Sequence, residues 1–322
     1  MNKKFVISIG IFSAVVVIAM AGFFFSKFSE PQKTTAGLAD AVKPAEKRYI
    51  KIMFAGDLMF DRGIRYYASL NGGNDFIFEK ISDLLKNNDL NVVNLEGPIT
   101  GNKSVSSGTV PGSANNYYFT FDPSFAKTLF DKNIELVNLG NNHILNFGRE
   151  GLAETKKYLG EAGVDYFGAP NGQKSTIKDI DGLKIGFVSY NEFSGNENEQ
   201  KEVSGEIIKT KGETDIIVVF CHWGVEYTKI PADSDISLAH QFVNAGADLV
   251  IGSHPHVTQI TEIYNEKRIY YSLGNFIFDQ YFSEDVRNGL GVVVKIDKQT
   301  KQIDFSELNF YLQTGGQTIV KN

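Results

Sequence analysis

Short apolar runs recur along the chain between Tyr49 and Phe310, separated by polar and glycine-containing segments. Apolar runs of this length, bounded by turn residues, are typical of strands buried on both faces. The pattern predicts strands at residues 49–55, 90–93, 134–137, 164–167, 184–190, 216–220, 249–251, 268–273, 290–296 and 303–310. No helical pattern separates the last two runs, so we expect them to be antiparallel.

Apolar residues at helical spacing predict helices between many of these strands. We expect helices at residues 77–86, 122–130, 151–162 and 233–245, with Asp122 as a cap and Gly163 as a terminator. Residues 101–116 and 192–206 are polar or rich in Gly, Ser and Asn, and they predict exposed loops. Strands and helices alternate without an internal repeat, which indicates one α/β domain with mixed sheets.

The first 48 residues predict a membrane anchor and a linker. Lys3 and Lys4 precede an apolar, uncharged run at residues 5–25 that is long enough to cross a bilayer. The positive charges favour a cytoplasmic stub at residues 1–4, a single-pass span and an extracellular domain at residues 49–322. Cleavage after Ala19-Met20-Ala21 is the alternative, but Phe23-Phe24-Phe25 extends the apolar run beyond it. Residues 26–48 carry prolines and lysines and predict a linker.

Composition excludes some functions. The 322 residues include 32 basic and 38 acidic side chains, giving a net charge of −6 without a basic stripe, so we expect no nucleic-acid partner. An anionic polymer would need a local positive site, such as bound metal ions. The single cysteine, Cys221, excludes an internal disulfide, and its place at the end of an apolar run predicts a buried thiol.

Side chains that can bind a metal ion, namely carboxylates, an amide and imidazoles, follow the apolar runs. They are Asp57, Glu96, Asn142, His143, His222, His254 and His256, and only His240 lies apart from them among the five histidines. Each alone is typical of a turn or a helix cap. Together they predict a metal site, because open α/β sheets bind ligands at strand ends and because imidazole and carboxylate bind zinc, manganese and iron.

The spacing suggests how this site is built. Asp57 and Glu96 would repel each other unless a cation lay between them. His254 and His256 would point to the same side of an extended segment stiffened by Pro255, and they could bind one metal or one each. Trp223, beside His222, would line the pocket.

These motifs resemble the capsule-biosynthesis family that takes part in making poly-γ-glutamate, itself similar to the calcineurin-like metallophosphoesterases. The resemblance extends from about Tyr49 to Val294. The matching segments are Gly56–Met59 with Arg62, Asn94–Pro98, Asn141–His143 with Phe147-Gly148, His222–Tyr227, Gly252–Val257 and Ser272–Gln280.

The resemblance implies a four-layer α/β/β/α sandwich with two mixed sheets and one or two divalent metal ions. It implies that Asp57, Glu96 and His256 bind one metal, that Glu96, Asn142, His222 and His254 bind a second, and that His143 donates a proton. It also implies that Arg62, Asn94, Trp223, Glu226 and Asn275 contact the substrate or support the ligands.

Two positions depart from these patterns. Met59 stands where phosphoesterases usually carry a histidine ligand, which puts a two-metal centre in question. Asn146 stands where the capsule proteins usually carry an aspartate near the proton donor.

The sequence leaves two functions open. The first is a metal-dependent hydrolase that acts on a phosphoester or amide of a cell-surface polymer. The second is a non-catalytic assembly factor that binds poly-γ-glutamate, or another anionic surface polymer, or the subunits of a membrane synthase. The predicted anchor would hold either one beside a membrane-bound synthase.

Overall fold

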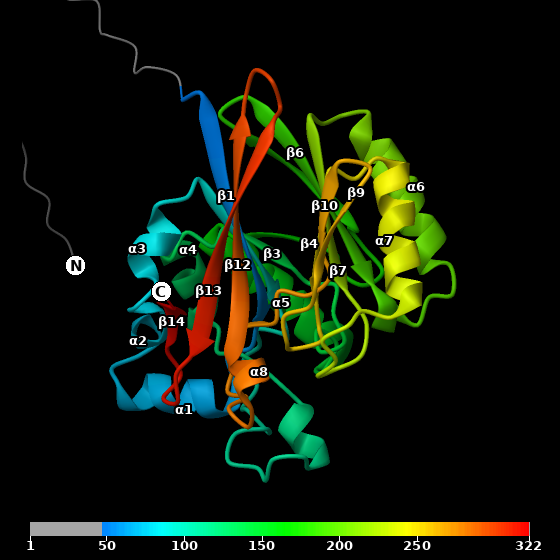
Figure 1. Cartoon of the computed structure of the whole chain (residues 1–322). Helices are drawn as coiled ribbons and strands as arrows, with labels where there is room; N and C mark the ends of the chain where they lie inside the picture. The colour runs from blue at the N-terminus through cyan, green and yellow to red at the C-terminus, as the bar shows by residue number, and fades with distance from the viewer. Residues whose placement is uncertain (1–46, 322) are drawn as a thin grey trace, which may run out of the picture. The chain divides into compact units, whose positions relative to one another are not determined.

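Two mixed β-sheets form the centre of the structure, a computed structural model that describes residues 47–321 (Figure 1). The predicted stub and membrane span, and nearly all of the predicted linker, lie outside these residues. Between residues 47 and 321, no helix is both long and apolar enough to span a membrane.

The larger sheet has eight strands. The order across it is β14-β13-β12-β1-β2-β3-β4, and β11 also pairs with β1. Strands β1 to β4 and β11 run parallel to one another, whereas β12 is antiparallel to β1 and the pairs β12–β13 and β13–β14 are antiparallel, as predicted for the late strands. The bounds are β1 Tyr49–Leu58, β2 Leu90–Leu95, β3 Leu136–Asn138, β4 Asp165–Phe167, β11 Asn275–Ile277, β12 Asn288–Asp297, β13 Ile303–Leu312 and β14 Thr318–Lys321.

The smaller sheet has six strands in the order β5-β6-β7-β8-β10-β9. Its four central strands are parallel, and its two edge strands are antiparallel. The bounds are β5 Ser175–Ile180, β6 Leu183–Asn191, β7 Ile216–His222, β8 Leu249–Ser253, β9 Thr261–Tyr264 and β10 Lys267–Tyr270.

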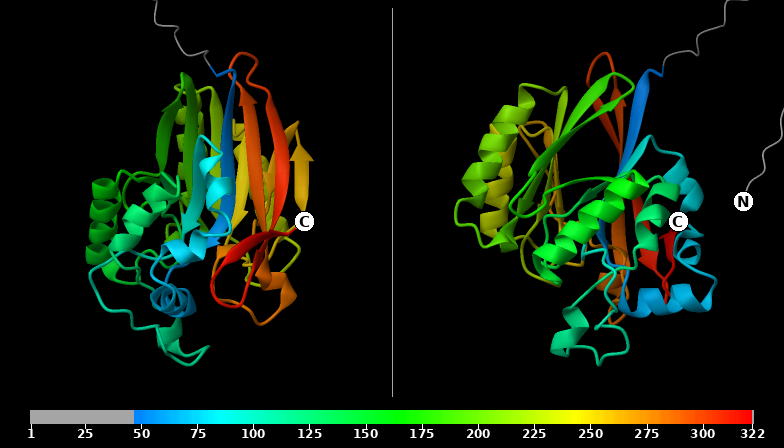
Figure 2. Two further views of the ribbon diagram at one scale, coloured as in Figure 1. Left: turned by 90° about the vertical axis from the view of Figure 1, so that its left-hand side faces the viewer. Right: turned by 180° about the vertical axis from the view of Figure 1, so that it is seen from behind.

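Helices cover the outer faces of both sheets (Figures 1 and 2). Helices α1 to α5 contribute to a core on the larger sheet, and α6 and α7 contribute to a core on the smaller one. The bounds are α1 Arg62–Leu70, α2 Asp75–Phe78, α3 Ser82–Lys86, α4 Ser124–Asp131, α5 Gly148–Ala162, α6 Glu199–Lys211, α7 Asp233–Ala245 and α8 Glu284–Arg287, with 3₁₀ turns η1 Ala114–Tyr117 and η2 Glu192–Ser194.

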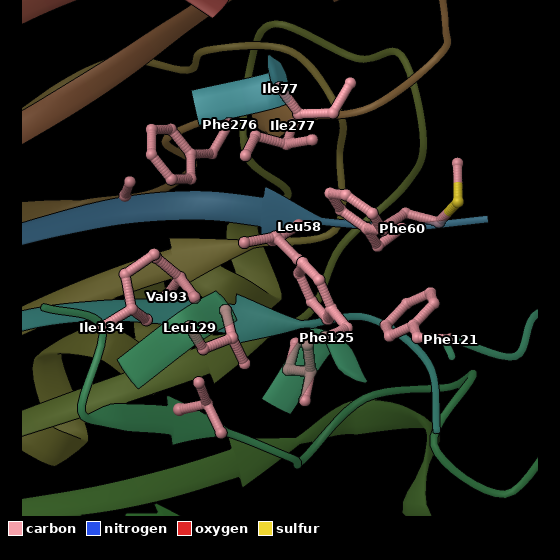
Figure 3. Packing of buried hydrophobic residues seen from close by; sticks show 14 of the residues in the cluster. Leu58, Phe60, Ile77, Val93, Phe121, Phe125, Leu129, Ile134, Phe276 and Ile277 are labelled. Carbon is pink, nitrogen blue, oxygen red and sulfur yellow. The ribbon is translucent and has the colours of Figure 1, made fainter. Parts of the chain in front are cut away.

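A third core fills the space between the two sheets, so the described residues form the four layers that the family resemblance implied. Successive side chains of a strand point to opposite faces, which explains the division. In β1, Ile52 and Phe54 enter the core between the sheets, while Met53 and Ala55 enter the outer core. Figure 3 shows part of this outer core, where Phe125 from α4 packs among strand residues.

The sequence predictions were wrong for two segments and missed an edge strand. Residues 192–206 are not an exposed loop: α6 begins at Glu199, and Val203 and Ile207 are buried one helical turn apart, a spacing too sparse to stand out in a polar segment. The helix predicted at residues 77–86 is two short helices, because the backbone leaves helical geometry at Ile81. The edge strand β5 was missed because its residues are half-exposed and alternate weakly.

The strand predicted at residues 268–273 ends at Tyr270, after which the chain crosses from one sheet to the other. Leu273 N–H still donates to Gly252 O of β8, and Asn275 then pairs with Asp57 of β1. Gly274 makes the turn with a positive φ of 65°. Its carbonyl comes so close to β1 that a Cβ at Gly56 would lie 1.8 Å from it. This crossing places Asn275 beside the ends of both sheets.

Candidate metal centre

Strand register gathers the polar strand ends into two rows. Across the larger sheet Asn275, Asp57, Asn94 and Asn138 are neighbours in register. Across the smaller sheet Asn191, His222 and Ser253 are neighbours. The two rows meet where Asn94 Nδ2 lies 3.2 Å from His222 Nδ1, so the sheets converge at one polar centre.

Three ligand-type side chains lie at this centre. The carboxylates of Asp57 and Glu96 and the ring of His222 each offer an atom within 4.8 Å of the others, and all three side chains are fully buried. They come from β1, the turn after β2, and β7. A buried group of two carboxylates and an imidazole is suited to a divalent cation.

His256 joins this group from the Asp57 side. Its Nδ1 lies 3.2 Å from Asp57 Oδ2 and 3.0 Å from Asn275 Oδ1, while its Nε2 lies 3.7 Å from Glu96 Oε1. Both neighbours of Nδ1 are acceptors, since the Asn275 amide group donates to Gln280 and to Val286 O. Nδ1 therefore carries the proton, and the Nε2 lone pair faces Glu96, the arrangement typical of a metal-binding histidine.

Asn142 and His254 join from the His222 side. His222 Nε2 lies 3.0 Å from Asn142 Oδ1 and 3.2 Å from His254 Nδ1. His254 N–H also donates to Asp57 Oδ2 at 3.1 Å, which ties the loop after β8 to the end of β1. The structure thus brings together all six residues predicted as metal ligands.

The geometry of the His254–His256 segment differs from the prediction. The segment is not extended: φ is 96° at His254 and 57° at His256, both left-handed values that are unusual for residues other than glycine. The rings converge nevertheless, with centroids 5.9 Å apart. The sharply bent backbone is held by the bond from His254 N–H to Asp57 and by the contacts of His256 with Asp57 and Asn275.

His143 lies at the edge of the centre. Its Nε2 is 3.8 Å from Glu96 Oε1, its Nδ1 is 3.3 Å from Asn146 Nδ2, and its ring packs on Phe119. Burial, and to a smaller extent the neighbouring imidazole of His256, lowers the pKa of His143 to about 3. His143 is therefore uncharged at neutral pH, and donating a proton would require a bound anion that raises its pKa.

Burial shifts the other titratable groups in different directions. It lowers the pKa of His222, and it lowers that of His254 to about 4, so both imidazoles are neutral and able to bind a metal. Burial would also raise the pKa of Asp57, but the hydrogen bonds from His256 and Asn94 and the nearby imidazole of His222 outweigh it and leave that pKa lowered. Burial and the nearby Asp57 carboxylate raise the pKa of Glu96 well above its usual value.

Glu96 provides the test of whether a cation fits. Both of its carboxylate oxygens are buried without a hydrogen-bond partner. A buried carboxylate without partners is unfavourable unless a cation or a proton neutralises it. Since Asp57, His222 and His256 lie around these oxygens, the residues present fit a bound divalent metal ion.

The residues predicted to support the site lie in different places. Asn94 Nδ2 donates to Asp57 Oδ1 at 2.8 Å, and Asn275 holds His256. Arg62 pairs with Asp279 and lies over the rings of Phe119 and Phe278. Glu226 is exposed near Glu96, whose pKa it helps to raise.

Trp223 does not line the site, which corrects the prediction. Its side chain is 1% exposed in the core beneath α6 and α7, where Nε1 donates to Tyr271 O at 2.9 Å. A residue directly after a strand-end ligand points to the opposite face, and here that face is the helix-covered one.

Sequence reasoning missed several contacts of the centre. Phe193 in η2 packs on His254 with ring centroids 4.3 Å apart, and nothing marked it within a segment interpreted as a loop. Asn141 accepts from His143 N–H and donates to Asn94 and to Leu95 O, which fixes the turn that carries His143. His240 lies apart, paired with Glu262.

Comparison with known proteins identifies the family. Residues 51–280 match the family model described as bacterial capsule synthesis protein PGA_cap. The chain is 28% identical over 288 residues to the capsule biosynthesis protein CapA of Bacillus anthracis, covering 83% of this chain and 69% of that one. It is 28% identical over 283 residues to the PGA biosynthesis protein CapA of Bacillus subtilis, covering 83% and 71%.

Because the family model spans most of the chain, the protein belongs to the bacterial capsule synthesis family PGA_cap. Among solved structures, TT1561 of Thermus thermophilus aligns with a TM-score of 0.44 and 13% identity, over 80% of this chain and 98% of that one.

Proposed function

We propose that this protein acts in poly-γ-glutamate capsule biosynthesis or export on the outer side of the cell membrane, with a divalent metal ion bound in its buried centre. Membership of the family and the names of the two Bacillus relatives support the process. The apolar run at residues 5–25, with Lys3 and Lys4 before it, supports the membrane location.

The unpartnered Glu96 carboxylate carries the proposal of a metal site. Both Glu96 oxygens lack partners, whereas Asp57 and His256 are each oriented by neighbouring groups. A fold that held these groups only for stability would have supplied donors to Glu96 as well. Manganese, zinc and iron all suit this mixture of carboxylate and imidazole.

The centre is suited to hydrolysis of a phosphoester or amide. When bound, a divalent ion supplies Lewis acidity toward a substrate oxygen. Neutral His143, at the open edge, is placed to exchange a proton with a substrate whose negative charge raises its pKa. Arg62, paired with Asp279, carries a positive charge that helps to lower the pKa values of Glu96 and His143.

Met59 favours a second candidate, a non-catalytic assembly factor. Its side chain is fully buried, and its sulfur accepts the Asp61 N–H instead of contributing a ligand. A centre with fewer ligands holds one ion more readily than two. One ion could still link the acidic protein to a carboxylate-rich polymer without any bond being broken.

We expect the double variant His254→Ala, His256→Ala to lose metal binding and capsule production. His254 lies against His222 and His256 lies against Glu96, so the removal of both imidazoles leaves too few ligands. Bound manganese or zinc would be measured on the full-length protein by elemental analysis. Capsule would be measured in a strain whose own gene is deleted and replaced by the variant.

His240→Ala is the matched control, because that histidine pairs with Glu262 outside the centre. It should retain both the metal and the capsule. Full capsule production by the double variant, with no metal bound, would show that the centre is dispensable and refute the proposed role.

The hydrolase and the assembly factor are distinguished by whether the protein catalyses hydrolysis of a substrate. We expect His143→Ala to lower hydrolysis of generic phosphodiesters by at least about 100-fold, the usual contribution of a positioned acid or base. Asn146→Asp should raise the rate near neutral pH, because a carboxylate beside Nδ1 raises the pKa of His143.

Rates would be measured on metal-loaded protein with its metal content verified. No turnover with manganese, zinc or iron in a folded, metal-bound protein would refute the hydrolase and leave the assembly factor. Equal rates for His143→Ala and the unmodified protein would remove His143 from the chemistry.

A further inference from the structure

A separate cavity of about 390 Å³ lies at the same end of the sheets as the metal centre. The end of β6 and the segment that follows β4 form part of its lining, which includes Ser189 and Asn191. Asn191 is in register with His222 of the metal centre, and Leu145, which also lines the cavity, follows His143 by two residues. The cavity therefore continues the row of strand ends where open α/β sheets bind ligands.

The 3₁₀ turn η2 stands between the cavity and the metal centre. Phe193 packs on His254 and His222, while its neighbour Ser194 lines the cavity. None of the six candidate metal ligands lines the cavity. It is a second site beside the first, within the size range of pockets for small molecules.

Charged groups of both signs meet at the cavity. Lys174 Nζ lies 2.6 Å from Glu199 Oε2 and 3.4 Å from Glu202 Oε2. Asn196 Nδ2 donates to the same two oxygens, at 3.1 and 3.0 Å. The glutamates lie in the first turn of α6, where the helix dipole favours negative charge. The three ionised groups leave one net negative charge.

Ser189 adds an unsatisfied group. Its side chain is 2% exposed, and its hydroxyl has no hydrogen-bond partner. The neighbouring backbone is kept close by glycine, since a Cβ at Gly168 would lie 2.4 Å from Ser189 Oγ. A buried hydroxyl without a partner is unfavourable by about 1–3 kcal/mol, and a ligand that bonds to it recovers that cost.

We propose that this cavity binds the head group of a free α-amino acid, with an ammonium and a carboxylate on one carbon. The carboxylate pairs with Lys174 and accepts from Ser189, and the ammonium donates to Glu199 and Glu202. A dianion without an amine would meet the net negative charge of the glutamates. A simple cation would have to displace Lys174 from Glu199.

The identity of the natural ligand rests on the proposed function. In a γ-linked glutamate chain the side-chain carboxyl forms the amide, so the amino-terminal residue keeps both its α-ammonium and its α-carboxylate. The cavity would then hold the end of the polymer beside the metal centre. An internal residue has no free ammonium and would bind poorly.

The test is calorimetric titration of the full-length protein, in a mild detergent because residues 5–25 are apolar. The ligands are glutamate, γ-glutamylglutamate, glutarate, which lacks the amine, and 4-aminobutyrate, whose two charges are on different carbons. We expect the first two to bind at least about tenfold more tightly than the others, since charge-assisted hydrogen bonds are lost with each omitted group.

Two variants connect this binding to the cavity. Lys174→Gln should weaken glutamate binding at least about tenfold. Ser189→Ala, which removes only the unpartnered hydroxyl and keeps the packing, should weaken it several-fold. Lys178→Gln is the matched control: this lysine, in β5 four residues after Lys174, pairs with Asp165, and its loss should not change binding.

Manganese binding, measured on the same samples, verifies that each variant is folded and separates the two proposals. Metal binding without glutamate binding would overturn this inference and leave the metal centre standing. Equal affinity for glutarate, or unchanged glutamate affinity in both Lys174→Gln and Ser189→Ala, would also overturn it. Glutamate binding without metal binding would support this site and refute the metal centre.

Discussion

Asp57→Ala is expected to lower the free energy of unfolding by about 3–5 kcal/mol and to abolish metal binding. The Asp57 carboxylate is fully buried and accepts from Asn94 Nδ2 and His254 N–H, and it lies 3.2 Å from His256 Nδ1. Alanine leaves these buried groups without an acceptor and frees the bent segment that carries both histidines. Urea unfolding in the presence of a chelator would measure the stability, and manganese titration the affinity.

The loss of stability caused by Asp57→Ala should become smaller at low pH. The pKa of Asp57 is lowered in the folded protein, because its contacts with His256, His222 and Asn94 outweigh burial. Because this pKa is lower in the folded than in the unfolded protein, ionised Asp57 contributes stability above the unfolded-state pKa of about 3.9. This contribution is lost as pH falls toward the folded-state pKa. The difference between the unmodified protein and Asp57→Ala should therefore shrink below about pH 4.

Asp61→Ala is the matched control for the metal readout. Asp61 is equally buried and accepts from Ser106 Oγ and Thr120 N–H, but it lies outside the candidate ligands. It should destabilise the fold while leaving metal affinity unchanged. Equal metal affinity in Asp57→Ala and Asp61→Ala would contradict the place assigned to Asp57.

Glu96→Gln is expected to stabilise the metal-free protein by about 1–3 kcal/mol near neutral pH while abolishing metal binding. The Glu96 carboxylate is buried with both oxygens unpartnered, and glutamine has the same shape without the charge. A substitution that strengthens the fold and eliminates ligand binding is typical of a group retained for function at the expense of stability.

The pH dependence of this second effect has the opposite sign. Burial and the Asp57 carboxylate raise the pKa of Glu96 in the folded protein. Because the pKa of Glu96 is higher in the folded than in the unfolded protein, protonated Glu96 contributes stability below the unfolded-state pKa. This contribution is lost as pH rises through the folded-state pKa. The advantage of Glu96→Gln should therefore grow with pH and disappear in acid.

Chelator-treated and manganese-loaded samples of both proteins would be unfolded in urea over this pH range. Glu213→Gln, at an exposed position, is the control for loss of one negative charge and should change stability little. A lower stability of metal-free Glu96→Gln than of the unmodified protein at neutral pH would contradict an unpaired buried carboxylate at this position. If manganese stabilised Glu96→Gln as much as the unmodified protein, Glu96 would have no part in metal binding.

The sequence indicated the site more fully than it indicated the folding around it. Asp57, Glu96, His222 and His256 could be named because each follows a buried apolar run, and parallel strands end at a common edge. Trp223 was misplaced because adjacent side chains point to opposite faces, and the sequence does not say which face a helix covers. Phe193 was missed because an exposed aromatic residue in a polar segment has no distinctive pattern.

The helices and strands likewise differ in how far the sequence predicted them. The strands of the interior were predictable because burial on both faces demands continuous apolar residues. Helix α6 was not, because a helix that covers one face needs few apolar positions, and here Val203 and Ile207 supply much of its packing. The crossing at Gly274 depends on the close approach of two sheets, which no local pattern encodes.

By itself, the sequence determined the alternation of strands and helices, the absence of an internal disulfide, the carboxylate and imidazole side chains at the strand ends and the resemblance to the capsule family. Only the tertiary structure decided that Glu96 is left without partners, that His254 and His256 converge through left-handed backbone, and that a charged cavity lies beside them. The physical reason is the separation along the chain of the residues that interact. Periodicity and residue type act between neighbours in the chain, whereas desolvation, pairing of charges and the space between side chains depend on which distant segments meet.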